Sequence, residues 1–258
     1  MTSTTPKPLK TALVTGASRR IGRAIALGLA ADGWRVGVHY GASHRDADAT
    51  VADIREAGGE AIAIEGDLAN AHALDTLIAR ASAALGPLAC LVNNASVFEN
   101  DRMTDFTRAS LERTLAVNLL APALLTQAFA RQLPKGAPGN VINILDQRVW
   151  RLTPRYLSYT LSKSALWTLT RTMAMALAPG IRVNAIGPGP TLPNETQDAA
   201  MFAHQAGSTI LGRGAGLDEI AAAVRFILAS QSMTGQMIAL DGGQHLAWET
   251  PDIVGMED

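Results

Sequence analysis

The sequence has little that would suit an oxidising compartment, a membrane or a nucleic acid. Its 258 residues include one cysteine, Cys90, so no disulfide can form within the chain. The apolar run Leu88 to Val92 around it predicts a buried, reduced thiol. Charged residues make up 17% and the net charge is -1, which argues against nucleic acid or an anionic membrane as a partner. No apolar run approaches the roughly 20 residues of a membrane span. Residues 1–10 lack the apolar core of a signal peptide, so we expect a cytoplasmic protein.

Hydrophobic residues make up 48% of the chain, which is enough for a large core. Short runs rich in β-formers alternate with longer helical patterns. The strands are predicted at residues 11–15, 35–40, 61–65, 88–93, 141–145, 182–186 and 237–240. The helices are predicted at residues 21–32, 46–57, 71–85, 110–133, 156–177 and 217–229. This alternation predicts a parallel sheet with helices on both faces.

We see no internal boundary or repeat, so residues 1–258 are predicted to form a single domain. The stretch 187–216 is predicted to be irregular and is longer than ordinary connections. That length favours a substrate lid over an inert loop.

A glycine-containing turn joins the first predicted strand to the first helix. It runs from Thr15 to Gly22 and has the form G-x-x-x-R-x-G, with Arg20 where a middle glycine is common. Gly16 would allow the tight turn and Gly22 close helix packing. The helix N-terminus would then offer backbone N–H groups to a pyrophosphate. The structural alternative is a plain strand–helix turn.

The end of the second predicted strand bears on the choice of cofactor. NAD enzymes usually place an acid there to hold the ribose 2′-hydroxyl, but this chain has none before Asp46. Four polar or basic side chains could instead surround a 2′-phosphate, which favours NADP: Arg19, His39, Ser43 and Arg45. Asp67, after the third strand, is placed either to accept a hydrogen bond from adenine or to cap the next helix.

Tyr159 and Lys163 are four residues apart in a predicted helix and so share one of its faces. Free tyrosine has a pKa of about 10. A neighbouring ammonium would lower that pKa towards neutrality, where proton transfer is most effective. The structural alternative is a pair of solvated helix residues. Asp146 lies thirteen residues before the tyrosine, at a predicted strand end.

These features together resemble the short-chain dehydrogenase/reductase family, over residues 9–246. The family landmarks appear in order at Thr15 to Gly22, Asp67, Asn93 to Ser96, Asn118, Tyr159 with Lys163, Pro188 to Pro190, and Leu240 to Gly243. The resemblance implies a single-domain Rossmann-type α/β fold, a doubly wound sheet of about seven parallel strands. It also implies a homotetramer. Apolar residues along the predicted helices 110–133 and 156–177 fit subunit interfaces, although one-sided core packing would look similar.

Two departures from the family pattern are similar to its pteridine reductase branch. Asp146 replaces the usual serine, and Ser96 ends the motif N-N-A-S where glycine is usual. Arg20, the pair His39-Tyr40 and Phe98 also match that branch. Ala42 differs, because the branch has an arginine there, which leaves Arg45 to take its place.

The resemblance implies roles for particular residues. The catalytic group is Asp146, Tyr159, Lys163 and Asn118. The cofactor site is Gly16, Ser18, Arg19, Arg20, Ile21, Gly22, His39, Tyr40, Ser43, Asp67, Leu68, Asn94, Ala95, Ser96, Tyr159, Lys163, Pro188 and Gly189. The substrate site is Phe98, Arg20, Asp146 and Tyr159, with Phe98 offering a face for stacking or, alternatively, packing in the core. Asp146, if poorly solvated, would be partly protonated and could donate or accept a proton.

Asn118 also has a backbone argument of its own. Pro122, four residues later in the same predicted helix, has no N–H, so the Asn118 carbonyl loses its usual partner. We predict that this proline helps to free the carbonyl for the water that the family places there. A kink without a functional role is the alternative.

The leading prediction is an NADPH-dependent reductase that transfers hydride to a C=N or C=O acceptor, with a pterin or dihydropterin as the preferred candidate. One alternative is a carbonyl reductase of the same fold, acting on 3-oxoacyl thioesters or sugars. An alternative of another class is a non-catalytic NADP-binding sensor. The expected partner is a small-molecule substrate, with no nucleic acid and no membrane. His204 and His245 lack metal-ligand spacing, so no metal is expected.

Overall fold

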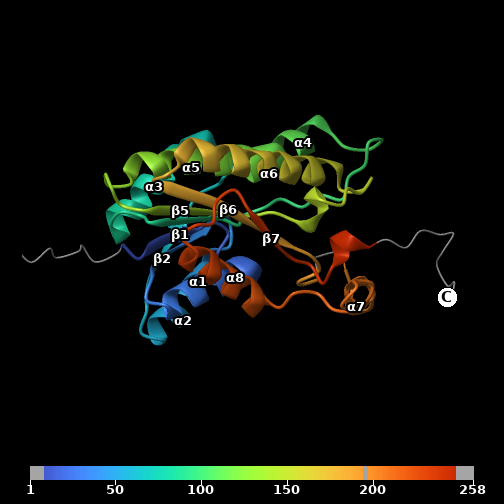
Figure 1. The fold of residues 1–258 in the computed structure, drawn as a ribbon, viewed down its shortest axis with the longest axis horizontal. Helices are drawn as coiled ribbons and strands as arrows, with labels where there is room; N and C mark the ends of the chain where they lie inside the picture. The colour runs from blue at the N-terminus through green and yellow to red at the C-terminus, as the bar shows by residue number, and fades with distance from the viewer. Residues whose placement is uncertain (1–8, 194–196, 248–258) are drawn as a thin grey trace, which may run out of the picture.

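The computed structural model describes residues 9–193 and 197–247 as one α/β domain (Figure 1). Its sheet has seven parallel strands in the order β3-β2-β1-β4-β5-β6-β7. The strands are β1 Thr11–Val14, β2 Arg35–Tyr40, β3 Glu60–Glu65, β4 Cys90–Asn93, β5 Gly139–Ile144, β6 Ile181–Pro188 and β7 Met237–Leu240. The predicted fold class is confirmed, and Cys90 is fully buried as predicted.

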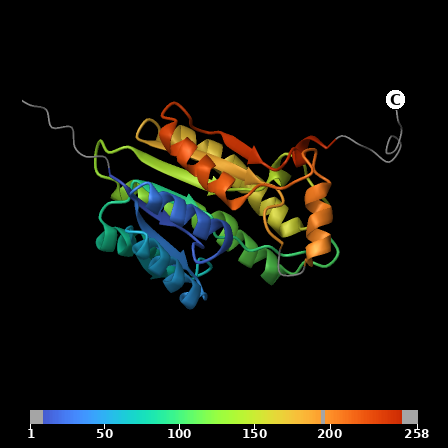
Figure 2. The same cartoon turned by 90° about the horizontal axis from the view of Figure 1, so that it is seen from below.

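Helices cover both faces of the sheet (Figures 1 and 2). They are α1 Arg20–Ala31, α2 His44–Glu56, α3 Ala71–Leu85, α4 Arg108–Leu115, α5 Ala121–Gln132, α6 Leu157–Leu177, α7 Ala199–Gly207 and α8 Leu217–Ala229. In Figure 1, α3, α5 and α6 lie on one side of the sheet and α1, α2 and α8 on the other. The strand order reverses direction from β1, so the edge beyond the strand C-termini is where this fold binds ligands.

The central strands are apolar on both faces because both faces are covered. In β1, Ala12 and Val14 belong to the core formed with α1, α2 and α8, whereas Leu13 belongs to the core formed with α3, α5 and α6. All three side chains are fully buried. Alternate side chains therefore anchor β1 in two separate layers, which holds its C-terminal turn in place.

The predicted helix 110–133 is not α-helical throughout. A π-helical segment, Ala116–Leu120, separates α4 from α5 and contains Asn118. Pro122 follows within the first turn of α5. The sequence predicted that this proline disturbs regular hydrogen bonding near Asn118, and the π-helical segment agrees with that part of the prediction. The predicted water stays a prediction.

The segment 187–216 is not irregular throughout, which corrects the prediction. Strand β6 continues to Pro188, and α7 forms between residues 199 and 207. Asp198 caps α7, with its Oδ1 accepting a hydrogen bond of 2.7 Å from the Met201 N–H. The helix has no fully buried residue, so it lies against the surface of the domain. Residues 194–196 of this segment lie outside the described residues.

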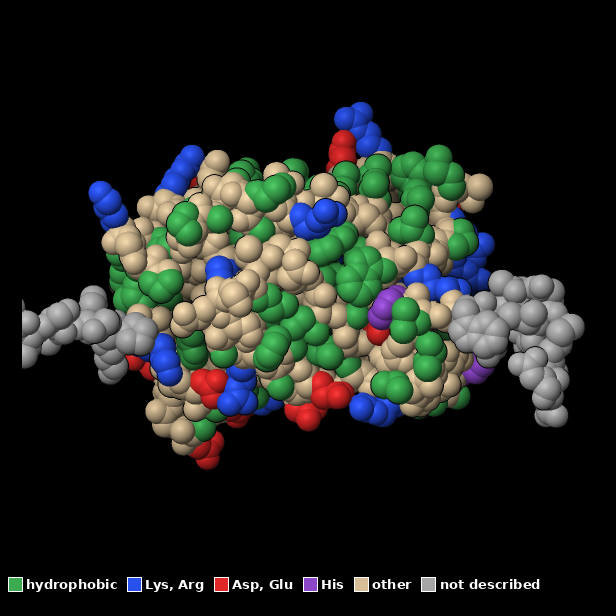
Figure 3. All heavy atoms as spheres, viewed as in Figure 1, with side chains coloured by type: hydrophobic (Ala, Val, Ile, Leu, Met, Phe, Trp, Pro, Cys, Tyr) green, Lys and Arg blue, Asp and Glu red, His purple; other side chains and the backbone are tan. Residues whose placement is uncertain are grey.

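The surface of the described residues mixes apolar and polar side chains. In the face shown in Figure 3, apolar side chains are interspersed across the middle, and most acidic side chains lie along the lower margin. Among the described residues, no helix combines the length and the apolar character that a membrane crossing requires.

Candidate active site

Tyr159 and Asp146 meet at the C-terminal edge of the sheet. Asp146 lies two residues beyond the end of β5, and Tyr159 lies in the first turn of α6. The Tyr159 hydroxyl donates a hydrogen bond of 3.0 Å to Asp146 Oδ2. Both side chains are largely buried, with Tyr159 7% and the Asp146 side chain 13% exposed. A phenol and a carboxylate are thus paired where a proton could be exchanged.

Arg148 holds the Asp146 carboxylate from the other side. Its Nη1 lies 2.9 Å from Asp146 Oδ2, and its backbone N–H donates to Oδ1 at 2.8 Å. The ion pair is shielded, since the Arg148 side chain is 15% exposed. The sequence analysis did not predict this pairing of Arg148 with Asp146. The sequence left the solvation of Asp146 open, and in the structure the ion pair replaces much of the lost water with a cation.

Lys163 does not act on the Tyr159 hydroxyl in this structure as the sequence predicted. Lys163 Nζ donates a hydrogen bond of 2.8 Å to the Ile144 carbonyl and lies 5.6 Å from the Tyr159 ring centroid. Burial lowers the pKa of Lys163 to about 8, although Asp146 opposes this. The Lys163 side chain is therefore still mostly charged at pH 7, but loses its charge in mild base.

The pKa of Tyr159 is raised well above its ordinary value, which overturns the predicted lowering. Burial is the main cause, followed by the negative charge of Asp146, while Arg148 acts in the opposite direction. The spacing of Tyr159 and Lys163 along the sequence could reveal neither the burial of Tyr159 nor its contact with Asp146. With its pKa raised, Tyr159 remains protonated at neutral pH and is suited to donate a proton.

Two further aromatic rings surround Tyr159. Phe98 stacks on Tyr156 with ring centroids 4.6 Å apart, and its ring lies 4.7 Å from that of Tyr159 in an edge-on arrangement. Phe98 is 39% exposed, so it is not a core residue. Tyr156 covers one face of the Phe98 ring, so a substrate would have to stack on the part of that ring that is still exposed. That role for Phe98 stays a prediction.

Asn118 is fully buried and ties the loop after β4 to the catalytic helix. Its side chain accepts from the Val97 N–H at 2.8 Å and donates to the Val97 carbonyl at 2.9 Å. It also donates to Ser162 Oγ at 3.0 Å, and Ser162 donates to the Tyr159 carbonyl at 2.7 Å. Ser96 Oγ donates to Asn118 Oδ1 at 3.2 Å. Asn118 therefore positions the backbone around Tyr159 through hydrogen bonds.

The turn between β1 and α1 has the close packing that the glycines predicted. Gly16 has a φ of +62°, and a Cβ on Gly22 would lie 2.2 Å from the Gly16 carbonyl oxygen. Asn94 Nδ2 donates to the Thr15 and Gly16 carbonyls at 2.8 and 3.1 Å. Thr15 Oγ1 in turn accepts from the N–H groups of Asn94 and Ala95. These hydrogen bonds hold the turn in one conformation.

His39, which was predicted to lie near a 2′-phosphate, is buried behind that turn and hydrogen-bonds to backbone groups. Its Nδ1 accepts a hydrogen bond of 3.1 Å from the Gly16 N–H, and its Nε2 is 2.9 Å from the Gly66 carbonyl. The first contact makes Nδ1 the acceptor, so Nε2 carries the hydrogen. Burial lowers the pKa of His39 to about 4, so the ring is neutral at pH 7. A part for His39 in cofactor binding stays a prediction.

Tyr40 is also buried, and its hydroxyl is 2.8 Å from His44 Nδ1. Burial raises the pKa of Tyr40. The Tyr40 ring therefore packs in the interior at the end of β2, and other residues form the exposed surface there. Ser43 and Arg45 lie at the start of α2, with Ser43 half-buried and Arg45 exposed.

Arg20, the first residue of α1, has a φ of +55°, a conformation that side chains rarely adopt. Its guanidinium donates hydrogen bonds to the carbonyls of Pro193 at 2.8 Å and Leu192 at 3.4 Å. Arg19, the N-cap residue of α1, makes no side-chain capping hydrogen bond to the helix. Because the Arg19 side chain does not cap them, the N–H groups of the first turn of α1 are suited to bind an anion.

The remaining predicted cofactor residues lie along the same edge. Asp67 is exposed and its Oδ1 accepts from the Ala69 N–H at 3.0 Å, while Asn70 caps α3. The helix-cap alternative for Asp67 is therefore wrong. Gly189 packs closely on Asp241, where a Cβ would lie 2.7 Å from that residue's backbone. Ser18 and Leu68 are buried, whereas Ile21 is half-buried and Ser96 is exposed.

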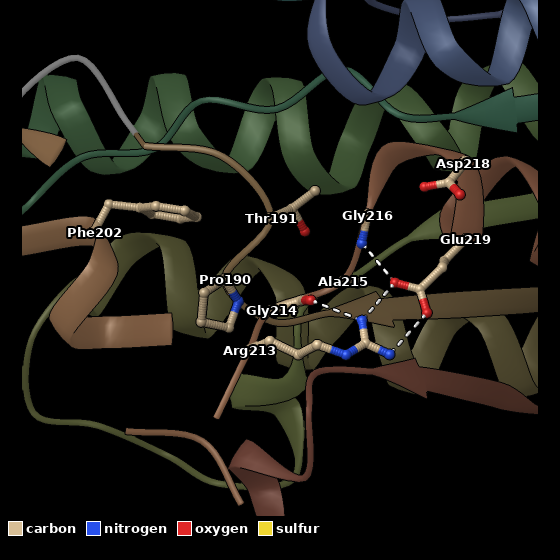
Figure 4. A pocket seen from close by; sticks show the side chains of 9 residues that line it. All are labelled: Pro190, Thr191, Phe202, Arg213, Gly214, Ala215, Gly216, Asp218 and Glu219. Atoms are coloured by element: carbon tan, nitrogen blue, oxygen red, sulfur yellow. Dashed lines mark hydrogen bonds and ion pairs between the residues drawn. The ribbon is translucent and has the colours of Figure 1, made fainter. Parts of the chain in front are cut away.

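A hollow of about 470 Å³ lies next to this edge, between Pro190, Phe202 of α7 and the start of α8 (Figure 4). Arg213 and Glu219 form an ion pair of 3.2 Å on its wall, and Glu219 also accepts from the Gly216 N–H at 2.7 Å. The hollow shares no lining residue with the group around Tyr159, so we place the chemistry at Tyr159. In the described ranges, no cluster of three histidine, cysteine or acidic residues could hold a metal ion.

Comparisons with known proteins identify relatives over nearly the whole chain. A family model described as enoyl-(acyl carrier protein) reductase matches residues 16–245. The crystal structure of FolM alternative dihydrofolate reductase 1 from Brucella suis, in complex with NADP, is 48% identical, with a TM-score of 0.91. The match covers 94% of this chain and 97% of that one.

Two other relatives show the range of the similarity. A short-chain dehydrogenase from Burkholderia cenocepacia, also crystallised with NADP, is 36% identical with a TM-score of 0.86, and 93% of this chain and 99% of that chain are covered. A 3-oxoacyl-[acyl-carrier-protein] reductase from Synechocystis is 35% identical over 90% of this chain and 95% of its own length.

Proposed function

The chain belongs to the short-chain dehydrogenase/reductase family, and we propose that it is an NADPH-dependent reductase of a pterin or dihydropterin. One observation carries the substrate class. An ionisable carboxyl group, Asp146, accepts the hydrogen bond from Tyr159 where the family usually has a neutral hydroxyl. A carboxyl group can exchange protons with a heterocycle that has C=N bonds, which a simple ketone does not require. The 48% identity to the Brucella dihydrofolate reductase supports the same class.

The residues of the β1–α1 turn fit NADP. A Cβ at position 22 would fill the space against Gly16, so the glycine keeps the turn close enough for a phosphate to reach the N–H groups of α1. Arg19, Ser43 and Arg45 are the predicted 2′-phosphate residues, and no acid at the end of β2 would repel that group. Pro188 and Gly189 would lie along the nicotinamide half. When bound, NADPH would supply the hydride.

Tyr159 would supply the proton. Its raised pKa keeps the hydroxyl protonated, and a substrate oxygen or nitrogen would compete with Asp146 for that proton. Lys163, one helical turn away, would stabilise the phenolate left after transfer. The pKa of Lys163, lowered to about 8, still leaves most molecules charged at pH 7. Asn118 would keep the backbone of this turn in place through Ser162.

A carbonyl reductase is the second candidate, because the Synechocystis relative reduces a 3-oxoacyl group according to its name. Its similarity covers 90% of the chain, against 94% for the Brucella protein, and its identity is 35% against 48%. A ketone requires only one proton donor, so Asp146 would have no evident task in that reaction.

The test is NADPH oxidation, followed at 340 nm, with dihydrobiopterin, dihydrofolate, a 3-oxoacyl thioester and a panel of ketones. We expect turnover of at least one pterin and a loss of 100-fold or more in Tyr159→Phe, with NADPH binding retained. Turnover of ketones or thioesters alone would overturn the pterin assignment. NADPH binding without turnover of any acceptor would favour the non-catalytic sensor.

We also propose a cytoplasmic homotetramer. Four large apolar side chains are exposed on the outer surfaces of α5, α6 and the π-helical segment: Leu120, Leu124, Leu161 and Met175. Such side chains are more stable when a second subunit covers them. Light scattering coupled to gel filtration would measure the assembly, and a monomer at micromolar concentration would contradict it.

A further inference from the structure

Arg148 contacts Asp146, although Arg148 is not one of the residues that the family pattern marks. Its Nη1 and the Tyr159 hydroxyl both bind the same oxygen, Asp146 Oδ2, at 2.9 and 3.0 Å. The backbone N–H of Arg148 binds the other oxygen, Oδ1, at 2.8 Å. The carboxylate is therefore held at three points, and two of them come from one residue. Only the remaining contact, to Tyr159, involves the proton that would be transferred.

Aromatic rings hold the Arg148 guanidinium in place. Its central carbon lies 5.0 Å from the Tyr156 ring centroid and 5.7 Å from that of Phe98. These two rings stack on each other, so they present a continuous surface against the cation. Tyr156 itself is fixed, with a φ of +57°, at the N-cap of α6. The guanidinium therefore contacts the aromatic pair and the carboxylate at the same time.

Few other charged groups face the Tyr159 hydroxyl. Asp146 and Arg148 approach it from the segment after β5, and Lys163 lies one turn further along α6 with its Nζ bound to Ile144. Phe98 and Tyr156 contribute uncharged rings from the loop after β4 and the start of α6. Among these groups, Arg148 is the cation in direct contact with Asp146.

We propose that Arg148 is a positioning residue for proton delivery: it fixes the Asp146 carboxylate so that Oδ2 stays aligned with the Tyr159 hydroxyl. This role rests on the proposed proton transfer from Tyr159, and it does not depend on which acceptor receives the proton. A glutamine could not reproduce it, because a neutral amide supplies neither the charge nor the fork of donors. A lysine would restore the charge but not the planar contact with the aromatic rings.

The test compares Arg148→Gln, Arg148→Lys and Arg151→Gln with the wild type. Arg151 is an arginine of the same loop whose side chain donates to the Ala247 carbonyl instead of Asp146, so it is a matched control. With the best acceptor of the panel, we expect kcat to fall tenfold or more in Arg148→Gln and less in Arg148→Lys. The KM for NADPH should stay within twofold of wild type in all three variants.

The pH profile separates positioning from a general structural role. The Arg148 cation opposes the raised pKa of Tyr159, so in Arg148→Gln that pKa rises further and the basic limb of kcat should move to higher pH. Arg151→Gln should keep the wild-type profile. Equal kcat values and equal profiles in the two glutamine variants would overturn the proposal. If Arg148→Gln does not fold, the same measurements on Arg148→Lys test the proposal. A wild-type kcat and a wild-type pH profile in that variant would overturn it.

A substrate-free measurement keeps this result distinct from the proposed function. The chain has three tyrosines, so 13Cζ-tyrosine NMR gives a signal for Tyr159 that Tyr159→Phe would assign. In base this signal should report the ionisation of the Tyr159 hydroxyl, at a higher pH in Arg148→Gln than in Arg151→Gln because Arg148 lowers the Tyr159 pKa. The same inflection in both would overturn the role of Arg148, even if no pterin is reduced. A shifted inflection without pterin turnover would support it while the pterin assignment fails.

Discussion

The guanidinium of Arg20 donates a hydrogen bond of 2.8 Å to the carbonyl of Pro193, 173 positions later in the chain. Arg20 opens α1 beside the phosphate turn, and Pro193 follows the predicted cofactor residues Pro188 and Gly189. One side chain therefore connects the turn proposed to bind the pyrophosphate with the segment proposed to cover the substrate. Arg20 makes this bond from a left-handed backbone conformation, with a φ of +55°.

Substitution of Arg20 should separate its backbone effect from its side-chain effect. Arg20→Gly removes the guanidinium and relieves the unfavourable φ, whereas Arg20→Ala removes the guanidinium only. We expect Arg20→Gly to be the more stable by about 1 kcal/mol in urea unfolding. The KM for the acceptor should rise by a similar factor in both. A wild-type KM in both variants would show that the bond to Pro193 has no part in binding.

Substitution of Asp146 should change both the pH range and the substrate preference. Asp146 is, after burial, the main cause of the raised pKa of Tyr159. In Asp146→Ser that pKa falls, so the phenol loses its proton at lower pH and the basic limb of the kcat profile should move down. Pterin turnover should fall by tenfold or more while ketone turnover falls less. Rate measurements from pH 5 to 11 would check both, and an unmoved basic limb would show that the Asp146 charge does not control the Tyr159 pKa.

His39 should make the protein less stable in mild acid. Its pKa is lowered to about 4 in the folded protein, against about 6.5 when unfolded, so the unfolded chain binds the proton more readily. The stabilisation is complete above pH 6.5 and is lost as the pH falls towards 4, by up to about 3 kcal/mol. Melting temperatures measured across this range should drop for wild type and much less for His39→Gln. Parallel curves for the two proteins would contradict this.

Asp101 should stabilise the start of the catalytic helix. Its Oδ1 accepts a hydrogen bond of 3.1 Å from the Ser158 N–H, next to Tyr159, and the N-cap residue Tyr156 makes no side-chain cap bond. Asp101→Ala should cost about 1 kcal/mol of unfolding free energy. Asp101→Asn keeps an acceptor oxygen and should cost less. Equal losses in the two variants would indicate that the capping bond is not the cause.

Local patterns predicted the elements that depend mainly on neighbouring residues. The bounds of β2, α3, α8 and β7 agree with the prediction, because apolar periodicity and flanking turns determine them within a few residues. The helix α7 was missed because the prediction read residues 187–216 as one irregular stretch, and its short pattern has no buried face to reveal it. Arg20 and Gly22 were recognised in the same way, since the turn they belong to is continuous in sequence.

The sequence by itself determined the family, the alternation of strands and helices, and which residues reach the carboxyl edge of the sheet. Only the tertiary structure decided their electrostatics. The pKa of Tyr159 rises because burial and Asp146 outweigh the opposing charge of Arg148, and His39 is neutral because it is buried behind the turn. The role proposed for Arg148 follows from its contacts with Phe98 and Asp146, which only the folded chain brings together. Burial and charge proximity depend on distances between segments far apart in the chain, which spacing along one segment does not specify.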